Sequence, residues 1–591
     1  MATSSTAVPL GSSISRRFYE PAVLYACLTK VHVMHKSTKA PDLETTAGKS
    51  NREAFYIFVD KLAQICDSKR GGDTVTAVAV LQHGRFEYRF TSNKRSQTAL
   101  DETTEYLTDI LQTLGEASDY EIIDGSSHQE AISALLLEKI LKFNAPRIRF
   151  YVKVVVKSLE YCIRSASQDR SVSAILVERC LRELEPFARS LNEVAANGTN
   201  EFARHGLNLL HAIDERFYKL EGFIKAKASV DPDADHGNPW ANLRHSIGRL
   251  QSYVIAVDVL ISARKQWPQI FGDFFVTAVP SSKPGNTPNL NAAIKSSCKK
   301  GDEKKPTGPA FSIIGRMTSD PTEMETYRHH GKKLQAMGLD QEILKVVKEG
   351  FRPVVHAEVH LLDALLRDDQ GRLPLDERPP RFFGEAEFGR YIGASKPTCQ
   401  LCSHYFKAHP LGVEVRPPHP NFYLPWRPPH VYKSDSGEAA AVKARNKILE
   451  QMIVNIRDAT FKTIKDMAAP WRKNDSSDTP SSNPFQRGLM DVPATLSMMA
   501  HPSRSVLPAT TGPQWSVADE YDDNDELVAR MGQLAVHSGQ DLRYAERGYY
   551  ECDVGQDWES VAEADDHGAT EGCDYLQLSD DEDDLGGGAY V

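Results

Sequence analysis

The chain has 591 residues, of which 41% are hydrophobic and 25% are charged. This balance is typical of globular proteins and excludes a collagen, a coiled-coil rod and a wholly disordered chain. We expect no membrane span, because no run of about 18 apolar residues occurs, and no secretory signal, because the N-terminus has no basic region before an apolar core. The nine cysteines are spread along the chain with one close pair, which indicates reduced thiols and a cytoplasmic or nuclear location.

The charge is divided unevenly along the chain. The formal net charge is -10, yet residues 519–591 hold 22 Asp and Glu against 3 Arg and no Lys, so they carry -19 and leave +9 for residues 1–518. A basic body favours polyanionic partners, and an acidic tail competes with them for the same surface. The simpler interpretation, that the tail only keeps the protein in solution, stays open.

The first elements predicted along the chain are a helix and two strands. Residues 1–50 are predicted to be an N-terminal segment that is partly helical. Residues 51–69 carry apolar side chains at helical spacing, and a Gly-Gly pair ends this helix. Residues 74–81 and 86–91 have β-branched and alternating patterns around a turn with glycine, which predicts a β-hairpin. We therefore interpret residues 51–95 as the first part of a mixed domain.

A long helical region follows. Residues 96–345 show apolar residues at three- and four-residue spacing without a repeat of fixed length, which predicts an α-helical block rather than a solenoid. Within it, residues 279–309 are rich in Pro, Ser and Lys and are predicted to form a flexible basic loop. The lysines of this loop could contact phosphate, although a solvated loop is the simpler interpretation.

The next segment, residues 346–430, returns to mixed structure. Its predicted elements are a helix at 354–367, a strand at 390–395, a short helix at 397–407, and strand-like pieces at 413–415 and 422–424. Residues 431–469 are predicted to contain a long C-terminal helix. Residues 470–591 are polar, rich in Pro and Ser and finally acidic, which predicts a disordered tail.

Four residues of this second mixed segment indicate a metal centre. His356 lies on the first predicted helix, and Cys399 and Cys402 form a C-x-x-C motif in the first turn of the next one. One imidazole and two thiolates are ligands that zinc prefers, and a zinc ion with three protein ligands keeps its fourth position for water. Glu358 is close enough in sequence to His356 to exchange a proton with that water without binding the metal.

The motif H-x-E followed by C-x-x-C resembles that of the zinc nucleobase deaminases in the cytidine deaminase-like superfamily. More specifically, the run YIGASKPTCQLC at 391–402 is similar to the branch that groups effector deaminases of intracellular bacteria with uncharacterised fungal proteins. The resemblance implies zinc on His356, Cys399 and Cys402, zinc-bound hydroxide as the nucleophile and Glu358 as the proton shuttle. It also implies a nucleobase, nucleotide or nucleic acid as substrate, and it leaves the oligomeric state open.

The fold that the resemblance implies is α/β. It is a deaminase-like mixed sheet with flanking helices, split into residues 51–95 and 346–430 by a large all-α insertion and followed by the disordered acidic tail. By the same resemblance, Asn93 at the end of the hairpin would contact a sugar; its alternative role is a polar cap of the strand end. Tyr423 and Trp426 are expected either to stack on a base or to pack in the core.

Other interpretations of these residues stay open. The chain is an active deaminase, an inactive deaminase-fold protein that serves as a binding or scaffold module, or an α-helical interaction protein with a structural zinc domain. A structural site needs a fourth protein ligand, and His404 and His409 could join Cys399 and Cys402 in such a closed site, although only one residue separates Cys402 from His404, against about a dozen in a zinc finger. His356 and His360 are spaced as in metalloproteases, but those enzymes need Glu directly after the first histidine. The two thiols could also be a redox pair.

Overall fold

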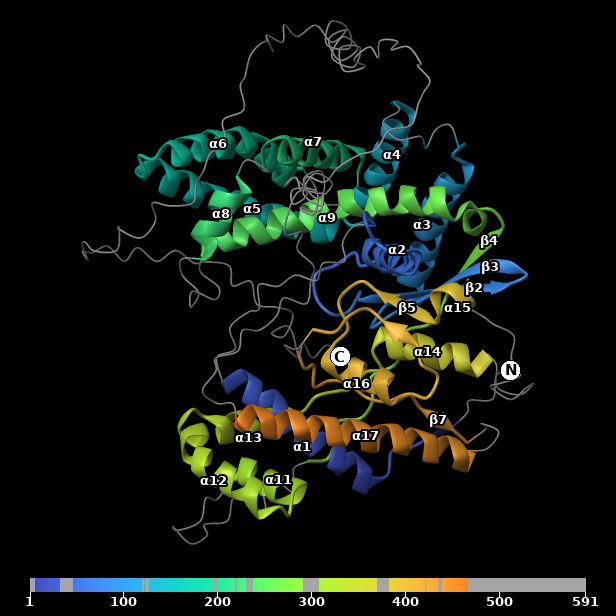
Figure 1. The fold of residues 1–591 in the computed structure, drawn as a ribbon, viewed down its shortest axis with the longest axis vertical. Coiled ribbons are helices and arrows are strands. Elements are labelled where there is room, and N and C mark those ends of the chain that lie inside the picture. Colours follow the sequence, from blue (N-terminus) through green and yellow to red (C-terminus); the bar gives the residue numbers. More distant parts are fainter. Residues whose placement is uncertain are drawn as a thin grey trace, which may run out of the picture. The chain divides into compact units, whose positions relative to one another are not determined.

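The computed structural model describes residues 6–31, 46–119, 122, 127–194, 199–217, 220–229, 238–290, 308–368, 382–419, 421–433 and 438–465. In this part the chain is mostly helical, with one five-stranded mixed sheet and one two-stranded sheet (Figure 1). The predicted basic loop at 279–309 is described only up to residue 290 and from residue 308. The predicted acidic tail at 470–591 lies outside the described residues.

The five-stranded sheet joins segments that are far apart in the sequence. Its strand order is β4-β3-β2-β5-β6. β2 and β3 form the predicted hairpin, and β5 pairs antiparallel with β2, so that Ala77 lies opposite Ala394. β4 and β6 add parallel strands at the two ends. The strands are β2 (Thr76–His83), β3 (Arg85–Ser92), β4 (Phe274–Ala278), β5 (Tyr391–Ala394) and β6 (Glu414–Val415).

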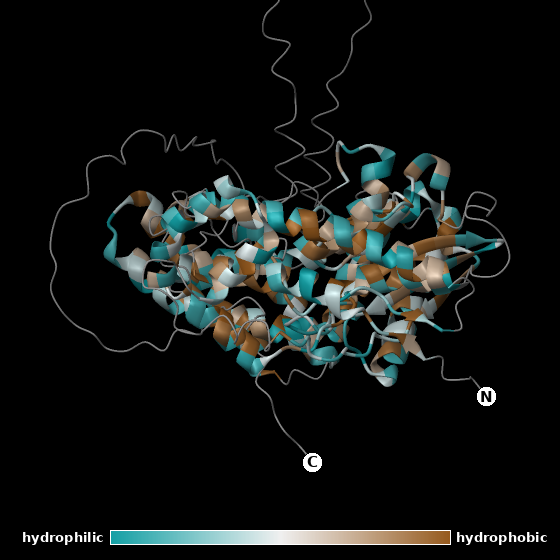
Figure 2. Cartoon of the chain, turned by 90° about the horizontal axis from the view of Figure 1, so that it is seen from below, coloured by the Kyte–Doolittle hydropathy of each residue, from teal (hydrophilic) through white to brown (hydrophobic). Residues whose placement is uncertain are grey.

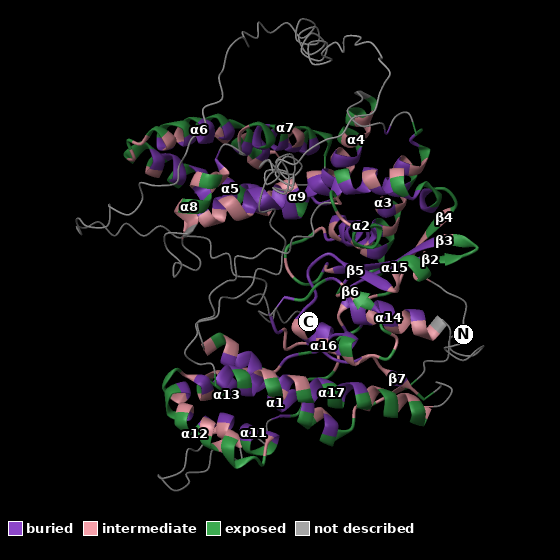
Figure 3. Cartoon of the chain, in the orientation of Figure 1, coloured by how far each residue is buried: buried purple, intermediate pink, exposed green. Residues whose placement is uncertain are grey.

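This sheet is covered on both faces, because alternate side chains of β2 enter two different cores. Val78 and Val80 pack in the first core, whereas Ala77, Ala79 and Leu81 pack in the second. Successive side chains of a strand point to opposite faces, so one core lies on each face of the sheet. β2 and β5 are accordingly buried over most of their length (Figure 3).

The first core joins helix α2 to the helical block. α2 begins with a capping box: the side chain of Ser50 accepts from the backbone N–H of Glu53, and the Glu53 carboxylate accepts from the backbone N–H of Ser50. α2 packs between the sheet and α9. The helices on this side of the sheet are α2 (Asn51–Ile65), α3 (Gln97–Glu116), α4 (Ser127–Phe143), α5 (Ala145–Gln168), α6 (Val172–Glu193), α7 (Asn200–Phe217), α8 (Glu221–Ser229) and α9 (Pro239–Gln266).

Helix α9 is the central helix of this block. By length and composition it is the one described helix that could cross a membrane, but 78% of its apolar window is buried inside the fold, as in a core helix. Helices throughout the described chain mix hydrophobic and hydrophilic residues along their length (Figure 2), which is typical of amphipathic helices that bury one side. A short 3-10 helix, Pro268–Phe271, connects α9 to β4.

The second core contains the segment with the zinc motif. Tyr19 of α1 donates a hydrogen bond to the carbonyl of Trp426 at 3.2 Å, and Glu20 of the same helix pairs with Arg316 at 2.9 Å. α17 packs against both α1 and α16. The helices of this side are α1 (Ser12–Val31), α11 (Pro309–Met317), α12 (Pro321–Ala336), α13 (Leu339–Glu349), α14 (Ala357–Asp368), α16 (Gln400–Ala408) and α17 (Glu438–Lys465).

The remaining described elements are short. β1 (Ala7–Val8) pairs antiparallel with β7 (Val431–Tyr432), so the segment before α1 meets the segment before α17 in the small sheet. Helix α15 (Glu385–Phe388) precedes β5 and buries Phe388 in the first core.

The structure corrects several sequence predictions. The region 96–345 is not all-α, because β4 lies within it and extends the sheet. Residues 422–424 form no strand; they lie between prolines, which cannot donate the hydrogen bonds of a sheet. The helices predicted at 354–367 and 397–407 begin later, at Ala357 and Gln400, since the residues before them are extended.

Candidate metal centre

Two helix N-termini bring the predicted ligands together. His356 directly precedes α14, and its carbonyl accepts the first helical hydrogen bond, from the backbone N–H of His360 at 2.8 Å. Cys399 is the N-cap of α16 rather than part of its first turn, and its Sγ accepts from the backbone N–H of Cys402 at 3.4 Å. The free N–H groups and the dipole of a helix N-terminus stabilise a thiolate at such a position.

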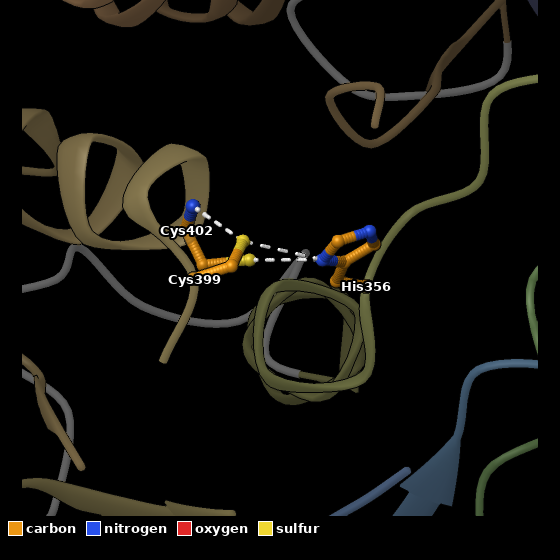
Figure 4. A group of neighbouring side chains, drawn as sticks. All are labelled: His356, Cys399 and Cys402. Carbon is orange, nitrogen blue, oxygen red and sulfur yellow. Dashed lines mark hydrogen bonds between the residues drawn. The ribbon is translucent and has the colours of Figure 1, made fainter. Parts of the chain in front are cut away.

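The three ligand atoms have the separations of a tetrahedral site. Nδ1 of His356 lies 3.5 Å from Sγ of Cys399 and 3.5 Å from Sγ of Cys402 (Figure 4). All three atoms lie within 4.8 Å of one another. Zinc–sulfur bonds of about 2.3 Å and zinc–nitrogen bonds of about 2.0–2.1 Å give a tetrahedron whose N···S edge is about 3.6 Å. The residues therefore fit a zinc ion, with one corner of the tetrahedron left for a fourth ligand.

The charges of the site also favour a cation. Burial raises the pKa of the Cys399 thiol, but hydrogen bonding with Cys402 and the charge of His356 outweigh burial and hold that pKa well below its usual value. Burial and the neighbouring Cys399 raise the pKa of the Cys402 thiol. Burial lowers the pKa of His356, and the Cys399 thiolate more than reverses that effect. Without a metal, the lowered pKa of Cys399 and the raised pKa of Cys402 favour one thiolate beside one neutral thiol; a cation bound between the two sulfurs would allow both to ionise.

Glu358 lies next to these ligands. Its Oε2 is 4.0 Å from Sγ of Cys402, and the residue is 4% exposed. Burial, followed by the charge of Cys399, raises the pKa of the Glu358 carboxyl to about 7. The group of mutually close ligand atoms contains His356, Cys399 and Cys402 without this carboxylate. A buried carboxyl near neutrality that is not itself a ligand is suited to accept a proton and return it.

Asn93, the predicted sugar contact, lies beside the centre and caps α14. Its Oδ1 accepts from the backbone N–H of Ala357 at 2.8 Å, and its Nδ2 donates to the carbonyl of Gly72 at 2.8 Å. The amide thus satisfies the first free N–H of the helix that follows His356. Contact with a substrate stays a prediction.

The two aromatic candidates differ in exposure. Trp426 is fully buried, with ring centroids of Phe18 and Tyr405 at 5.6 and 6.0 Å, so its ring packs in the core and has no surface free for a base. Its indole lies close enough to Cys402 to lower the pKa of that thiol. Tyr423 is half-buried, and its hydroxyl accepts from Nδ2 of Asn421 at 3.4 Å. Tyr423 alone of the pair could reach a substrate.

The histidines considered for other kinds of site point elsewhere. Nε2 of His360 donates to the carbonyl of Pro280 at 2.9 Å, and Nδ1 of His409 accepts from the backbone N–H of Leu411 at 3.4 Å. His404 faces the amide of Asn455 at 3.5 Å. Within the part of the chain that the structure describes, no histidine of these three joins the ligand group. The described residues therefore offer three protein ligands. They form neither a closed zinc finger with four protein ligands nor a two-histidine protease site.

One contact beside the centre has no signal in the sequence. Ser282, in the segment predicted to be a flexible loop, places its Oγ 3.1 Å from both the backbone N and the backbone O of Val355, next to His356. A Pro- and Ser-rich pattern predicts a loop and gives no signal of its partner, so sequence alone could not have identified this contact.

Comparison with known proteins supports a deaminase-like segment. The model of the OTT_1508-like deaminase family, within the cytidine deaminase-like superfamily, matches residues 355–430. This range contains all three candidate ligands and Glu358, and it leaves out the hairpin, the helical block and residues 279–290. Neither a curated protein nor a solved structure matches the chain.

Proposed function

We propose that the protein is a zinc-dependent hydrolytic deaminase that acts on the base of a nucleotide or nucleic acid. One observation carries this proposal: an imidazole nitrogen and two sulfurs lie at tetrahedral separations beside a buried carboxyl that is not a ligand. The match of a deaminase family model to the same residues supports the choice of reaction.

His356, Cys399 and Cys402 would hold the zinc ion, which when bound lowers the pKa of water and so supplies a nucleophile at neutral pH. The carboxylate of Glu358 takes up the proton that water loses and gives it to the amino group that leaves as ammonia. Overall, water replaces the amine on the ring carbon, so no external oxidant or reductant is needed. Burial of Glu358 keeps bulk water from competing for that proton.

The choice of a phosphate-bearing substrate is a proposal supported by charge. Lys94, which follows Asn93, lies near enough to His356 for its charge to oppose protonation of the imidazole. The side chain of Lys94 is 42% exposed, and its ammonium forms a surface pair with Asp73 at 2.9 Å, an interaction of the kind that contributes little to stability. A substrate phosphate could replace that carboxylate. The net charge of +9 on residues 1–518 favours the same class of substrate.

The test is replacement of Glu358 by Gln, which keeps the size of the side chain and removes its proton transfer. We expect about one zinc per chain in both proteins, and ammonia release from a nucleoside, nucleotide and oligonucleotide panel that is lower by about 10²–10⁴-fold in E358Q. Glu349→Gln is the control, because this glutamate is exposed and is the last residue of α13.

Two outcomes would contradict the proposal. Undiminished ammonia release by E358Q would remove the proposed role of the carboxyl. Stoichiometric zinc without ammonia from any substrate, in the unaltered protein, would instead favour a deaminase-like binding module without catalysis.

A further inference from the structure

The extended backbone that precedes His356 forms hydrogen bonds on both of its sides. Val354 donates its N–H to the carbonyl of Pro425 at 3.2 Å, and its carbonyl accepts from the N–H of Arg427 at 2.9 Å. In extended backbone, successive residues direct their N–H and C=O groups to opposite edges. The polar backbone groups of Val355 therefore face away from residues 425–427.

Ser282 satisfies both of these groups. Its Oγ lies 3.1 Å from the nitrogen of Val355 and 3.1 Å from its oxygen. A hydroxyl can accept one hydrogen bond while it donates another, so one side chain takes the place of a neighbouring strand. Val355 is 2% exposed and Ser282 is 9% exposed, so water cannot easily replace the serine.

Ser282 is itself fixed by the segment that carries it, which we call the strap and define as residues 279–285. At its start, Val279 donates its N–H to the carbonyl of Phe90 at 2.7 Å, and Thr91 donates its hydroxyl to the carbonyl of Val279 at 2.9 Å. At its end, Gly285 donates its N–H to the carbonyl of Pro353 at 2.7 Å. The strap thus spans from the end of β3 to the residues before the metal ligand.

We infer that Ser282 is a positioning residue for the metal ligand His356, and that the strap is part of the metal centre although it lies outside the segment matched by the deaminase family model. The inference rests on the metal centre proposed above. Ser282 holds the backbone on one side of His356, and Asn93 holds Ala357 on the other side. Together these contacts fix where the imidazole meets the two sulfurs.

The experiment measures zinc affinity, which does not require a known substrate. Zinc dissociation constants are determined by competition with a chromophoric chelator for the unaltered protein and for Ser282→Ala. Loss of a group that orients a ligand typically weakens metal binding by about 10- to 100-fold, and we expect a loss in that range. We also expect the visible absorption of the cobalt-substituted protein to change, because the imidazole is no longer held in one orientation.

The control is Ser281→Ala, in the same segment. The hydroxyl of Ser281 accepts from the backbone N–H of Arg95 at 2.9 Å, and the structure shows no hydrogen bond between that hydroxyl and Val355. Ser281→Ala should therefore keep zinc affinity within about threefold, well below the loss expected for a group that orients a ligand. Ser282→Thr keeps the hydroxyl and should restore most of the affinity.

Each result bears on the inference. Equal zinc affinity and an unchanged cobalt spectrum in Ser282→Ala would overturn it, as would equal losses in Ser281→Ala and Ser282→Ala. If the alanine variant does not fold, Ser282→Cys replaces it, since a thiol has a similar shape but is a much weaker donor and acceptor. Failure of the deaminase proposal would appear separately, as tight zinc binding that depends on Ser282 without ammonia release.

Discussion

Asp60 shows how one buried carboxyl ties helix α2 to the strand that leads into the metal centre. Its Oδ1 accepts from the backbone N–H of Ala394 at 3.0 Å, and its Oδ2 accepts from the hydroxyl of Tyr391 at 2.9 Å and lies 3.5 Å from Nε of Arg416. Burial raises its pKa to about 6, and the charge of Arg416 opposes this rise only in part. The folded protein therefore holds a proton on Asp60 that the unfolded chain releases at lower pH.

This pKa predicts a specific dependence of stability on pH. Because the pKa of Asp60 is raised in the folded protein, its contribution to the free energy of unfolding is greatest below the unfolded pKa of 3.8. This contribution is lost as the pH rises through about 6. The shift corresponds to about 3 kcal/mol. In Asp60→Asn this part of the pH dependence should vanish. Urea unfolding at pH 4 and pH 7 should show that the stability difference between wild type and variant is larger at pH 4.

The control for this experiment is Asp101→Asn, which alters an exposed aspartate of α3. The difference in unfolding free energy between this variant and wild type, measured at both pH values, gives the baseline for replacing an exposed aspartate. If Asp60→Asn differs from wild type equally at pH 4 and pH 7, Asp60 does not hold a proton in the folded protein.

At the level of single residues, the sequence was sufficient to name the three side chains that the structure brings together, but not the residues that support them. His356, Glu358, Cys399 and Cys402 were predictable because the chemistry of the site needs those residue types at short spacing. The contact of Ser282 was not, because it depends on a backbone group about 70 residues away in the chain. The cap that Asn93 forms on α14 was not anticipated either, because the sequence offered a sugar contact or a polar cap of the strand end and gave no signal of a helix about 260 residues later.

The contact between α2 and β5 depends on a glycine. A Cβ placed on Gly393 would lie 2.7 Å from the carbonyl carbon of Val59 and 2.9 Å from the nitrogen of Asp60. These are backbone atoms of a helix, so they cannot move aside as the end of a side chain can. The absence of a side chain at Gly393 therefore lets α2 lie directly on the strand.

Gly393→Ala should destabilise the protein by about 1–3 kcal/mol or more, because the added methyl forces α2 away from β5. Thermal unfolding measures the effect. The matched control is Gly315→Ala in α11, where an added Cβ meets no atom within 4 Å. That change should stabilise the protein by about 0.5–1 kcal/mol, as alanine favours a helix interior. A Gly393→Ala protein as stable as wild type would show that α2 does not rest on this strand as described.

Among the elements, those with strong local patterns were predictable and those defined by distant partners were not. The hairpin β2–β3, β5 and the helices α2, α14 and α16 all occur where their periodicity or turn residues indicate. β4 has only five residues and forms by parallel pairing with β3, a partner about 190 residues earlier, so a local window could not separate it from the loop that follows. At 422–424 a favourable strand composition is overridden by the flanking prolines.

On the scale of the whole molecule, the sheet is the element that the two cores share. β2 contributes side chains to both cores, and the strap crosses from the end of β3, on the sheet, to the start of α14 in the second core. The centre is therefore assembled from residues before, within and after the helical block. A segment limited to residues 355–430 contains the ligands but lacks Ser282, Asn93 and the strand β2 against which β5 pairs.

The last prediction concerns the uneven charge of the chain. Residues 519–591 carry -19, whereas residues 1–518 carry +9, so we expect the two parts to attract each other and a polyanion to compete with that attraction. Truncation after Ala518 should tighten binding of a single-stranded oligonucleotide by about tenfold at low salt, with E358Q used to prevent turnover. The gain should shrink as salt rises, because the Debye length falls from about 30 Å at 0.01 M to about 3 Å at 1 M.

A full-length protein whose tail has Asn and Gln in place of Asp and Glu separates the effect of charge from the effect of length, and it should bind the oligonucleotide as tightly as the truncated form. Equal affinity of the unaltered and truncated proteins at low salt would show that the tail does not compete for the basic surface and serves only to keep the protein in solution.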